Sequence, residues 1–547
     1  MLSKASKIMY ISARTNRHQE KIEVVSRVNG KRIEDSFPID YTFYYSDSNG
    51  GYRTIFGDHV SKVTPKSSKE FHIDLSRLSG KKLWESDLNP VFKCLSKHFR
   101  GSGVPNLHLT FLDIEVNFSK EKGYATPEDP FSEVTAITIS YSWEDNRLIT
   151  LALRPKTYSA EKAQEIGANF SDTIVFETEK ELLDAFLLLI EDSDVLSGWN
   201  SESYDIPYLV NRIIRVLGKD DTRRLCLWNE YPQEKKIEKY GKESKTYELV
   251  GRVAIDLLQV YRKFTYEERH SYSLDSIAEY ELHDCKTPYA GSLDQLYYDD
   301  FEKFIEYNRK DVELLVRLED KLKFISLMNM ISHENSVLIP NALGTVTMMD
   351  QAILNRVHDM GLIGVNRRQK DAIEIPGAYV ANPNVGVHEW VGSFDLTSLY
   401  PSNIRALNMS PETIVAQVRL EYTEKMIREK LAKEKTWTEC WTGVFETLEY
   451  QAIIDKREDV QLIIDWEKKS SETMTAADVY KMIFESGEKW VISANATIYS
   501  LEHVGVVPEM LTDWFRDRKN IQRQAEELDI ILHGVKIPMD VYRELDA

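Results

Sequence analysis

Cysteine is scarce in this sequence, and the few cysteines lie far apart. The four are Cys94, Cys226, Cys285 and Cys440, and none belongs to a Cys-x-x-Cys pair. This spacing argues against a structural zinc site and favours a reducing compartment.

Long apolar runs are lacking as well. No apolar stretch approaches the roughly 18–20 residues that a membrane-spanning helix needs. Residues 1–10 lack the apolar core of a signal peptide. We therefore expect no membrane partner and a cytoplasmic location.

The chain also has no excess of positive charge, since its formal net charge is −19. Taken alone, this argues against a protein that binds nucleic acid. Two considerations weaken the argument. Metal-dependent phosphoryl-transfer sites need acidic clusters, and an acidic protein can still hold DNA in a local basic groove.

The size and composition indicate a folded protein of several domains. The 547 residues exceed the roughly 250–300 at which a single core stops growing. The sequence is 42% hydrophobic and 29% charged, as in globular proteins. Residues 1–105 alternate short apolar strands with turn clusters, which predicts a β-rich domain.

An α/β domain is predicted next, over residues 106–324. Three strands are expected first, followed by a helix, a strand and a helix, which is the order of an RNase H-like fold. Their expected ranges are 107–118, 134–143, 148–153, 179–191, 194–198 and 206–217. A long helix over 301–328 closes the domain.

The first expected strand carries two carboxylates, Asp113 and Glu115. Side chains alternate along a strand, so both point to one face, about 7 Å apart, while Leu112 and Ile114 point to the other. Two carboxylates on one face of a buried strand are costly unless a cation or donors satisfy them. An Asp-x-Glu pair alone also fits a purely structural role, so both interpretations stay open.

The helix expected over 301–328 places a carboxylate inside its apolar stripe. Asp311 lies at the three-and-four spacing of that stripe, where an unpartnered carboxylate is unfavourable. Tyr307 lies one turn earlier on the same face, with its hydroxyl able to reach the same site. A metal would supply the missing partner, and bonds to nearby backbone amides are the alternative.

A fourth carboxylate, Asp205, is expected at the carboxyl end of the strand that finishes at Gly198. Here the sequence resembles a known family, because three segments match in order the exonuclease motifs of family B DNA polymerases. The residues of these segments are most similar to those of bacteriophage enzymes of the T-even type. The matching residues are Asp113 with Glu115, then Gly198-Trp-Asn with Asp205, then Tyr307-x-x-x-Asp311.

The resemblance implies a 3′–5′ proofreading exonuclease that hydrolyses DNA with two Mg²⁺ or Mn²⁺ ions. Asp113, Glu115 and Asp311 would carry the ions, and Asp205 would complete the cluster. Tyr307 would orient the attacking water. The substrate would be a single-stranded 3′ end of DNA, and a viral protein would act in the host cytoplasm.

The segment from Ser393 to Ser402 resembles the first polymerase motif of the same family. Asp395 is expected at the end of a strand formed by residues 390–394, with a helix after it. The resemblance makes Asp395 a ligand of two polymerase metals, sets the backbone of Leu396 and Leu399 beside the incoming dNTP, and places Tyr400 under its sugar.

A helix expected from Pro508 to about Gly534 carries the basic residues Arg518, Lys519 and Arg523, which the resemblance assigns to the triphosphate. Gln522 stands where the family usually has a lysine, which puts the usual two-point grip in doubt. The family would make residues 367–504 a partial α+β palm and residues 505–547 the first half of helical fingers. Residues 325–366 would join the N-terminal domain.

Two family motifs are not found in this sequence: Lys-x-x-x-Asn-Ser-x-Tyr-Gly and Asp-Thr-Asp-Ser. We therefore expect a subunit of a split polymerase, completed on primer–template DNA by a second chain with the remaining fingers, palm and thumb. That chain could also contact a sliding clamp. The alternatives are a stand-alone 3′–5′ DNA exonuclease, and a truncated or non-catalytic chain that binds nucleic acid.

Overall fold

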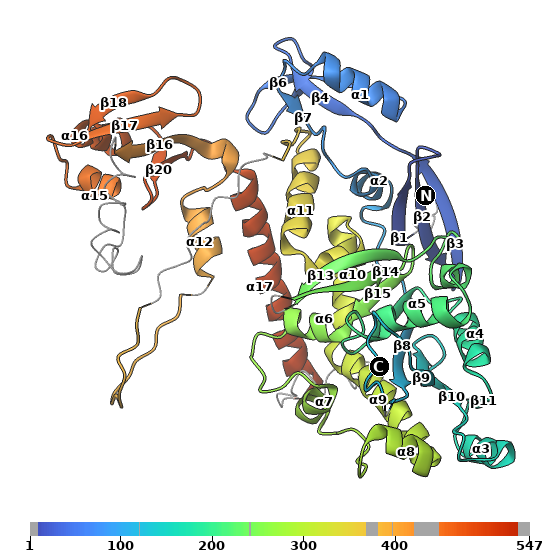
Figure 1. The fold of residues 1–547 in the computed structure, drawn as a ribbon. Coiled ribbons are helices and arrows are strands. Elements are labelled where there is room, and N and C mark those ends of the chain that lie inside the picture. Colours follow the sequence, from blue (N-terminus) through green and yellow to red (C-terminus); the bar gives the residue numbers. More distant parts are fainter. Residues whose placement is uncertain are drawn as a thin grey trace.

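The computed structural model describes residues 9–119, 121–239, 242–367, 381–396, 398–420 and 448–533. Within these, the side chains of 237–239, 242–244, 448 and 526–533 are left out of the description. The chain has several sheets and many helices, so the expected mixed α/β class is confirmed (Figure 1). The finer division into named domains stays a prediction.

The N-terminal part contains two small sheets and two helices. The first sheet is an antiparallel meander of β1 (Tyr10–Asn16), β2 (Lys21–Val28) and β3 (Lys31–Pro38). The second has the order β5-β6-β4-β7. Its elements and the accompanying helices are β4 (Phe43–Ser46), β5 (Tyr52–Arg53), β6 (His59–Val63), β7 (Leu83–Trp84), α1 (Ser68–Arg77) and α2 (Pro90–Phe99).

A six-stranded sheet forms the centre of the next part, in the order β11-β10-β9-β8-β12-β15. Strands β8, β9 and β10 pair antiparallel, whereas β12 lies parallel to β8 and β15. The bounds are β8 (Leu109–Val116), β9 (Val134–Tyr141), β10 (Arg147–Leu153), β11 (Thr173–Phe176), β12 (Val195–Gly198) and β15 (Val253–Asp256).

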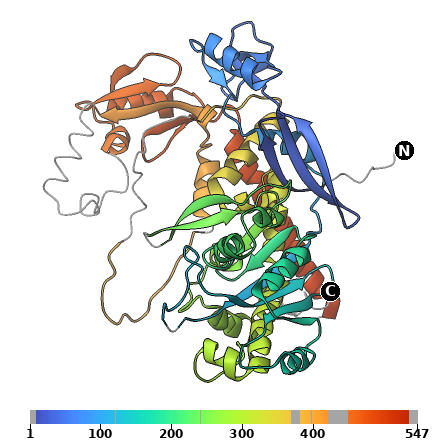
Figure 2. The same cartoon turned by 45° about the vertical axis from the view of Figure 1, so that its right-hand side comes forward.

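Helices cover both faces of this sheet (Figures 1 and 2). On one face, Leu112 and Ile114 pack against α4 (Glu179–Leu189) and α5 (Asp205–Val216). On the other face, Phe111 packs in a core shared with α9 (Phe301–Leu322). The remaining elements of this part are α3 (Ala160–Gly167), η1 (Asp220–Leu225), β13 (Gln233–Lys239), β14 (Lys242–Glu248), α6 (Leu257–Phe264), α7 (Leu274–Leu282) and α8 (Leu293–Asp299).

The long helix expected over 301–328 is wrong in one respect, because the structure has two helices there. Helix α9 (Phe301–Leu322) ends at Lys323, whose φ of 54° lies in the left-handed region, and α10 (Phe324–Asn335) follows. The Glu319 carboxylate accepts the amide N–H of Ile325, which caps α10. Apolar spacing continues across the break, so periodicity alone could not reveal it.

The C-terminal part has a five-stranded antiparallel sheet in the order β18-β17-β16-β20-β19. Helix α17 (Val506–His533) confirms the helix expected from Pro508, and it contacts α11 and α12. The other bounds are η2 (Ile339–Leu343), α11 (Thr345–Asp359), α12 (Leu399–Ala406), η3 (Pro411–Thr413), β16 (Ile414–Leu420), α15 (Leu448–Ile454), β17 (Gln461–Trp466), β18 (Glu472–Thr475), α16 (Ala476–Tyr480), η4 (Lys481–Glu485), β19 (Trp490–Ile492) and β20 (Thr497–Ser500).

The strand expected over residues 390–394 is wrong. Residues 381–396 form an extended loop without regular structure (Figure 1), and Trp390 and Phe394 are each 99% exposed. A strand needs a neighbour for its backbone groups, and none of the described residues pairs with this segment.

No described helix combines the length and apolar character needed to cross a membrane.

Candidate metal centre

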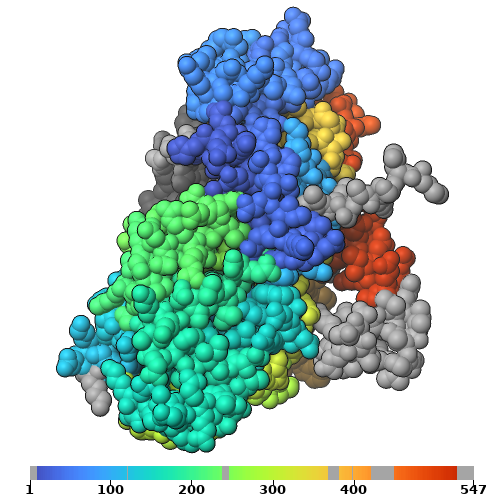
Figure 3. Space-filling model, turned by 90° about the vertical axis from the view of Figure 1, so that its right-hand side faces the viewer, coloured from blue at the N-terminus to red at the C-terminus, as the bar shows by residue number. Residues whose placement is uncertain are grey.

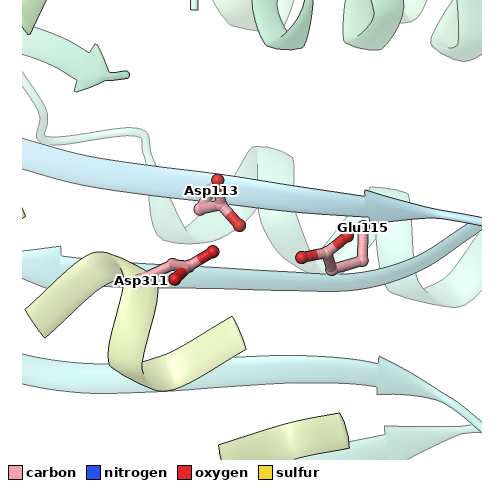
Figure 4. Close-up of side chains that lie close together, drawn as sticks. All are labelled: Asp113, Glu115 and Asp311. Carbon is pink, nitrogen blue, oxygen red and sulfur yellow. The ribbon is translucent and has the colours of Figure 1, made fainter. Parts of the chain in front are cut away.

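Three carboxylates meet between β8 and α9, as Figure 4 shows. Asp113 and Glu115 come from the strand and Asp311 from the helix, with one oxygen of each within 4.8 Å of the others. They lie on the face of β8 that Phe111 shares, opposite to Leu112 and Ile114. The alternation expected from the sequence is therefore confirmed.

Asp311 is the most buried member of the cluster, with 1% of its surface exposed. Its Oδ2 accepts a bond from Lys286, but its Oδ1 has no hydrogen-bond partner among the described residues. A buried carboxylate oxygen without a partner is costly. Because three carboxylates converge there, the donor set fits a hard divalent cation such as Mg²⁺ or Mn²⁺.

Asp205 lies beside this cluster, not inside it. It is the first residue of α5, is 6% exposed, and its Oδ1 accepts the amide N–H of Ile114 at 3.4 Å. Ile114 stands between the two strand carboxylates in the sequence, so Asp205 contacts the backbone of β8 next to the cluster. It is not among the three carboxylates that lie within 4.8 Å of one another.

Tyr307 faces the cluster from α9, one turn before Asp311. Its hydroxyl accepts a hydrogen bond from Lys286 Nζ at 2.9 Å, and the same amine lies 2.5 Å from Asp311 Oδ2. Lys286 thus links the tyrosine to the carboxylates. It stands in the loop after α7, 25 positions before Asp311.

Lys286 and Asn308 are the site residues that sequence reasoning missed. Asn308, which is fully buried on α9, donates from Nδ2 to Asp113 Oδ2 at 2.8 Å. Its position next to Tyr307 could have indicated a role in the site, because a buried side-chain amide on an apolar helix face needs a hydrogen-bond partner. Lys286 had no such signal, because its loop has no periodicity.

Burial dominates the electrostatics of the centre. It raises the pKa of Asp113 and Asp311 above their usual range, and neighbouring carboxylates add to the effect at Asp113. Burial also raises the pKa of Glu115 to about 8 and that of Asp205 to about 7. At Lys286 burial lowers the pKa, but the charges of Asp311 and Asp113 outweigh it and raise the pKa overall.

These pKa values predict that metal binding depends steeply on pH. Carboxyl ligands must lose their protons to bind a cation. Since the pKa of Glu115 is about 8, the apparent affinity for Mn²⁺ should rise from about pH 6 to pH 8, by about tenfold per pH unit for each proton released. Isothermal titration calorimetry in buffers of different ionisation enthalpy would count the protons. Constant affinity across this range would contradict the prediction.

The same shifts predict the metal-free stability. A carboxyl whose pKa is raised in the folded state contributes stability that is complete below its unfolded value, about 4. That contribution is lost as pH rises through the folded values, about 7 for Asp205 and about 8 for Glu115. The free energy of unfolding of the metal-free parent should therefore fall, relative to that of Glu115→Gln, between about pH 4 and pH 8. Urea unfolding at a series of pH values would measure it, and parallel pH profiles of the two proteins would contradict the prediction.

The residues expected at a polymerase site are not gathered into a comparable centre. Asp395 and Leu396 are exposed in the loop before α12, and Leu399 and Tyr400 on α12 are 44% and 69% exposed. On α17, Arg518, Lys519 and Arg523 are exposed as well. Their assigned roles stay predictions.

Comparison with known proteins decides the family. The profile described as "DNA polymerase family B, exonuclease domain" matches residues 84–277, and that described as "DNA polymerase family B" matches residues 342–529. The chain belongs to the family B DNA polymerases. The matched stretches contain Asp113, Glu115 and Asp205 in the first case and Asp395 with Tyr400 in the second.

Individual relatives within family B agree with this placement. The "DNA-directed DNA polymerase" of Escherichia phage RB69 is 32% identical over 327 residues, which are 56% of this chain and 36% of the relative. That of Enterobacteria phage T4 is 25% identical over 485 residues, or 84% of this chain and 54% of the relative. "DNA polymerase 1" of Sulfolobus acidocaldarius is 27% identical over 364 residues, covering 62% and 38%. The chain therefore spans about half, or less, of the length of these relatives.

Proposed function

We propose that this chain removes nucleotides from the 3′ end of DNA by metal-dependent hydrolysis, as a 3′–5′ exonuclease. The observation that carries the proposal is the cluster of the half-buried Asp113 and Glu115 with the buried Asp311, whose Oδ1 has no hydrogen-bond partner among the described residues. Membership in family B gives the cluster its substrate class, because the relatives are named as DNA polymerases.

Asp113, Glu115 and Asp311 would hold divalent Mg²⁺ or Mn²⁺, with Asp205 supporting them through its contact with the backbone of β8. Two such ions, when bound, activate the attacking water and stabilise the leaving 3′-oxygen. Asn308 fixes the Asp113 carboxylate through its 2.8 Å bond. Tyr307 and Lys286 form a donor pair at the edge of the cluster that can orient the attacking water.

We also propose that the second matched region serves DNA synthesis, with dNTP and primer–template DNA as substrates. Asp395 would bind the polymerase metals, the backbone of Leu396 and Leu399 would approach the triphosphate, and Tyr400 would contact the sugar. Arg518, Lys519 and Arg523 on α17 would grip the phosphates. Support comes from the family match over residues 342–529 and from the helices α12 and α17 that carry most of these residues.

The second chain and the sliding clamp stay predictions from the sequence, because no finding tests them. The same holds for the proposed division into an N-terminal domain, an RNase H-like domain, a partial palm and partial fingers. Primer extension by the purified chain, alone and mixed with the polymerase segments of a relative that lie outside the matched region, would test the second chain. Robust incorporation by the chain alone would contradict it.

The direct test of the exonuclease proposal is digestion of a 5′-labelled single-stranded oligonucleotide. With Mg²⁺ or Mn²⁺, we expect a ladder of products shortened from the 3′ end, and no products with EDTA. A 3′-terminal phosphorothioate of the unreactive configuration should stop the reaction at the first bond. Release of label from the 5′ end, or internal cleavage, would contradict the proposal.

A further inference from the structure

The loop that carries Lys286 is attached to α9 by a second cluster of charges, separate from the metal centre. Asp284 Oδ2 accepts a hydrogen bond from Lys310 Nζ at 2.8 Å and another from the guanidinium of Arg317. Both donors lie on α9, and Lys310 directly precedes Asp311. Glu313 holds the same two cations, at 3.2 Å and 3.4 Å.

Contacts on the other side of Lys286 complete the attachment. The amide N–H of Lys286 donates to Asp275 Oδ1 at 2.8 Å, and the ring of Tyr289 packs edge-to-face on Tyr307 at 5.2 Å. The side chain of Lys286 remains 28% exposed and enters the cluster from the loop. The position of its amine therefore depends on how firmly the loop is fixed to α9.

We propose that Asp284 is a positioning residue, which acts through Lys286 on the exonuclease site. This inference rests on the proposed function. A lysine side chain has a flexible four-carbon stem, so its amine keeps one position only if the backbone that carries it is fixed. Asp284 fixes the loop, and together with Glu313 it engages the amine of Lys310 away from the metal cluster. Lys286 is thereby the cation that reaches Tyr307 and Asp311.

Asp284→Asn removes the charge and keeps the size. For single-stranded DNA we expect kcat to fall by about 10- to 100-fold, the usual cost of losing a supporting partner around a metal site, with KM unchanged. Asp284→Glu keeps the charge and should restore most of the activity. Lys310→Gln combined with Arg317→Gln breaks the same contacts from α9 and should reproduce the loss.

A double-mutant cycle separates positioning from a general structural effect. In the Lys286→Met background, Asp284→Asn should cause no further loss of kcat, because the residue through which it acts is gone. An equal loss in both backgrounds would overturn the proposal. Asp320→Asn is the matched control, since Asp320 lies on α9 and makes exposed contacts with Lys323, at 3.3 Å, and with Asn146, at 3.4 Å. It should behave as the parent.

Chemical labelling tests the proposal without catalysis. In the metal-free protein, acetic anhydride should modify the Lys286 amine several-fold faster in Asp284→Asn than in the parent or in Asp320→Asn, as read by peptide mass spectrometry. Equal labelling in all three folded proteins would overturn it. If the parent digests no DNA, the proposed function fails, while the labelling still decides whether Asp284 positions Lys286.

Discussion

Replacing Asp113 and Glu115 together by alanine is expected to abolish degradation of single-stranded DNA, with a rate loss of at least about 1,000-fold. The two residues supply both strand carboxylates of the cluster, and Asp311 alone cannot hold two cations. Electrostatic stabilisation by such groups accounts for a large share of enzymatic rate enhancement. The measurement is the single-turnover rate on a 5′-labelled oligonucleotide with saturating enzyme and Mg²⁺.

The fold should survive this double change. In the metal-free protein the two carboxyls are neighbours of the same sign near Asp311, and burial raises their pKa. Removing them should therefore leave the thermal midpoint equal to that of the parent or higher. Asp459→Ala, which removes an exposed carboxylate paired with Arg457 in the C-terminal part, serves as the control for activity. Digestion by the double variant at the parental rate would show that the site is elsewhere.

Replacing Arg27 by alanine is expected to cause a large loss of stability, about 3–5 kcal/mol, as for a broken buried ion pair. Arg27 on β2 makes two bonds of 2.7 Å to the carboxylate of Asp194, and the side chains are 3% and 1% exposed. Asp194 also accepts the amide N–H of His108 at 3.0 Å. The substitution leaves a buried carboxylate that has lost its main cation.

This ion pair joins the N-terminal sheet to the central sheet. Figure 3 shows the N-terminal residues lying directly against the green and teal part of the chain. Urea unfolding of Arg27→Ala, compared with Arg457→Ala at an exposed pair, would measure the effect. The control should unfold as the parent does, because surface pairs contribute little. A loss for Arg27→Ala no larger than for the control would contradict the role assigned to the pair.

The two strand carboxylates could be predicted from the sequence because their placement follows from local periodicity. Alternation along β8 alone sets Asp113 and Glu115 on one face, and the helical stripe of α9 alone points Asp311 inward. Each rule acts within a few residues. The meeting of strand and helix then follows once both apolar surfaces pack in one core.

Lys286 could not be predicted in this way. It lies in a loop, and its position results from contacts with α7 and α9, which no spacing rule within the loop encodes. The helix break at Lys323 and the irregular backbone of residues 390–394 could not be predicted from the sequence for a related reason. Apolar spacing says which residues prefer burial, but not whether a neighbouring element is there to cover them.

The most direct measurement for the proposed metal centre is anomalous diffraction from crystals grown with Mn²⁺ and a short single-stranded oligonucleotide. The predicted result is two manganese peaks about 3.5–4 Å apart, within coordination distance of Asp113, Glu115 and Asp311. The phosphodiester of the 3′-terminal nucleotide should lie between them. The Lys286 amine should then have left Asp311 and remained beside Tyr307. Manganese bound elsewhere, with Lys286 still on Asp311 and the oligonucleotide 3′ end outside this cluster, would contradict the account.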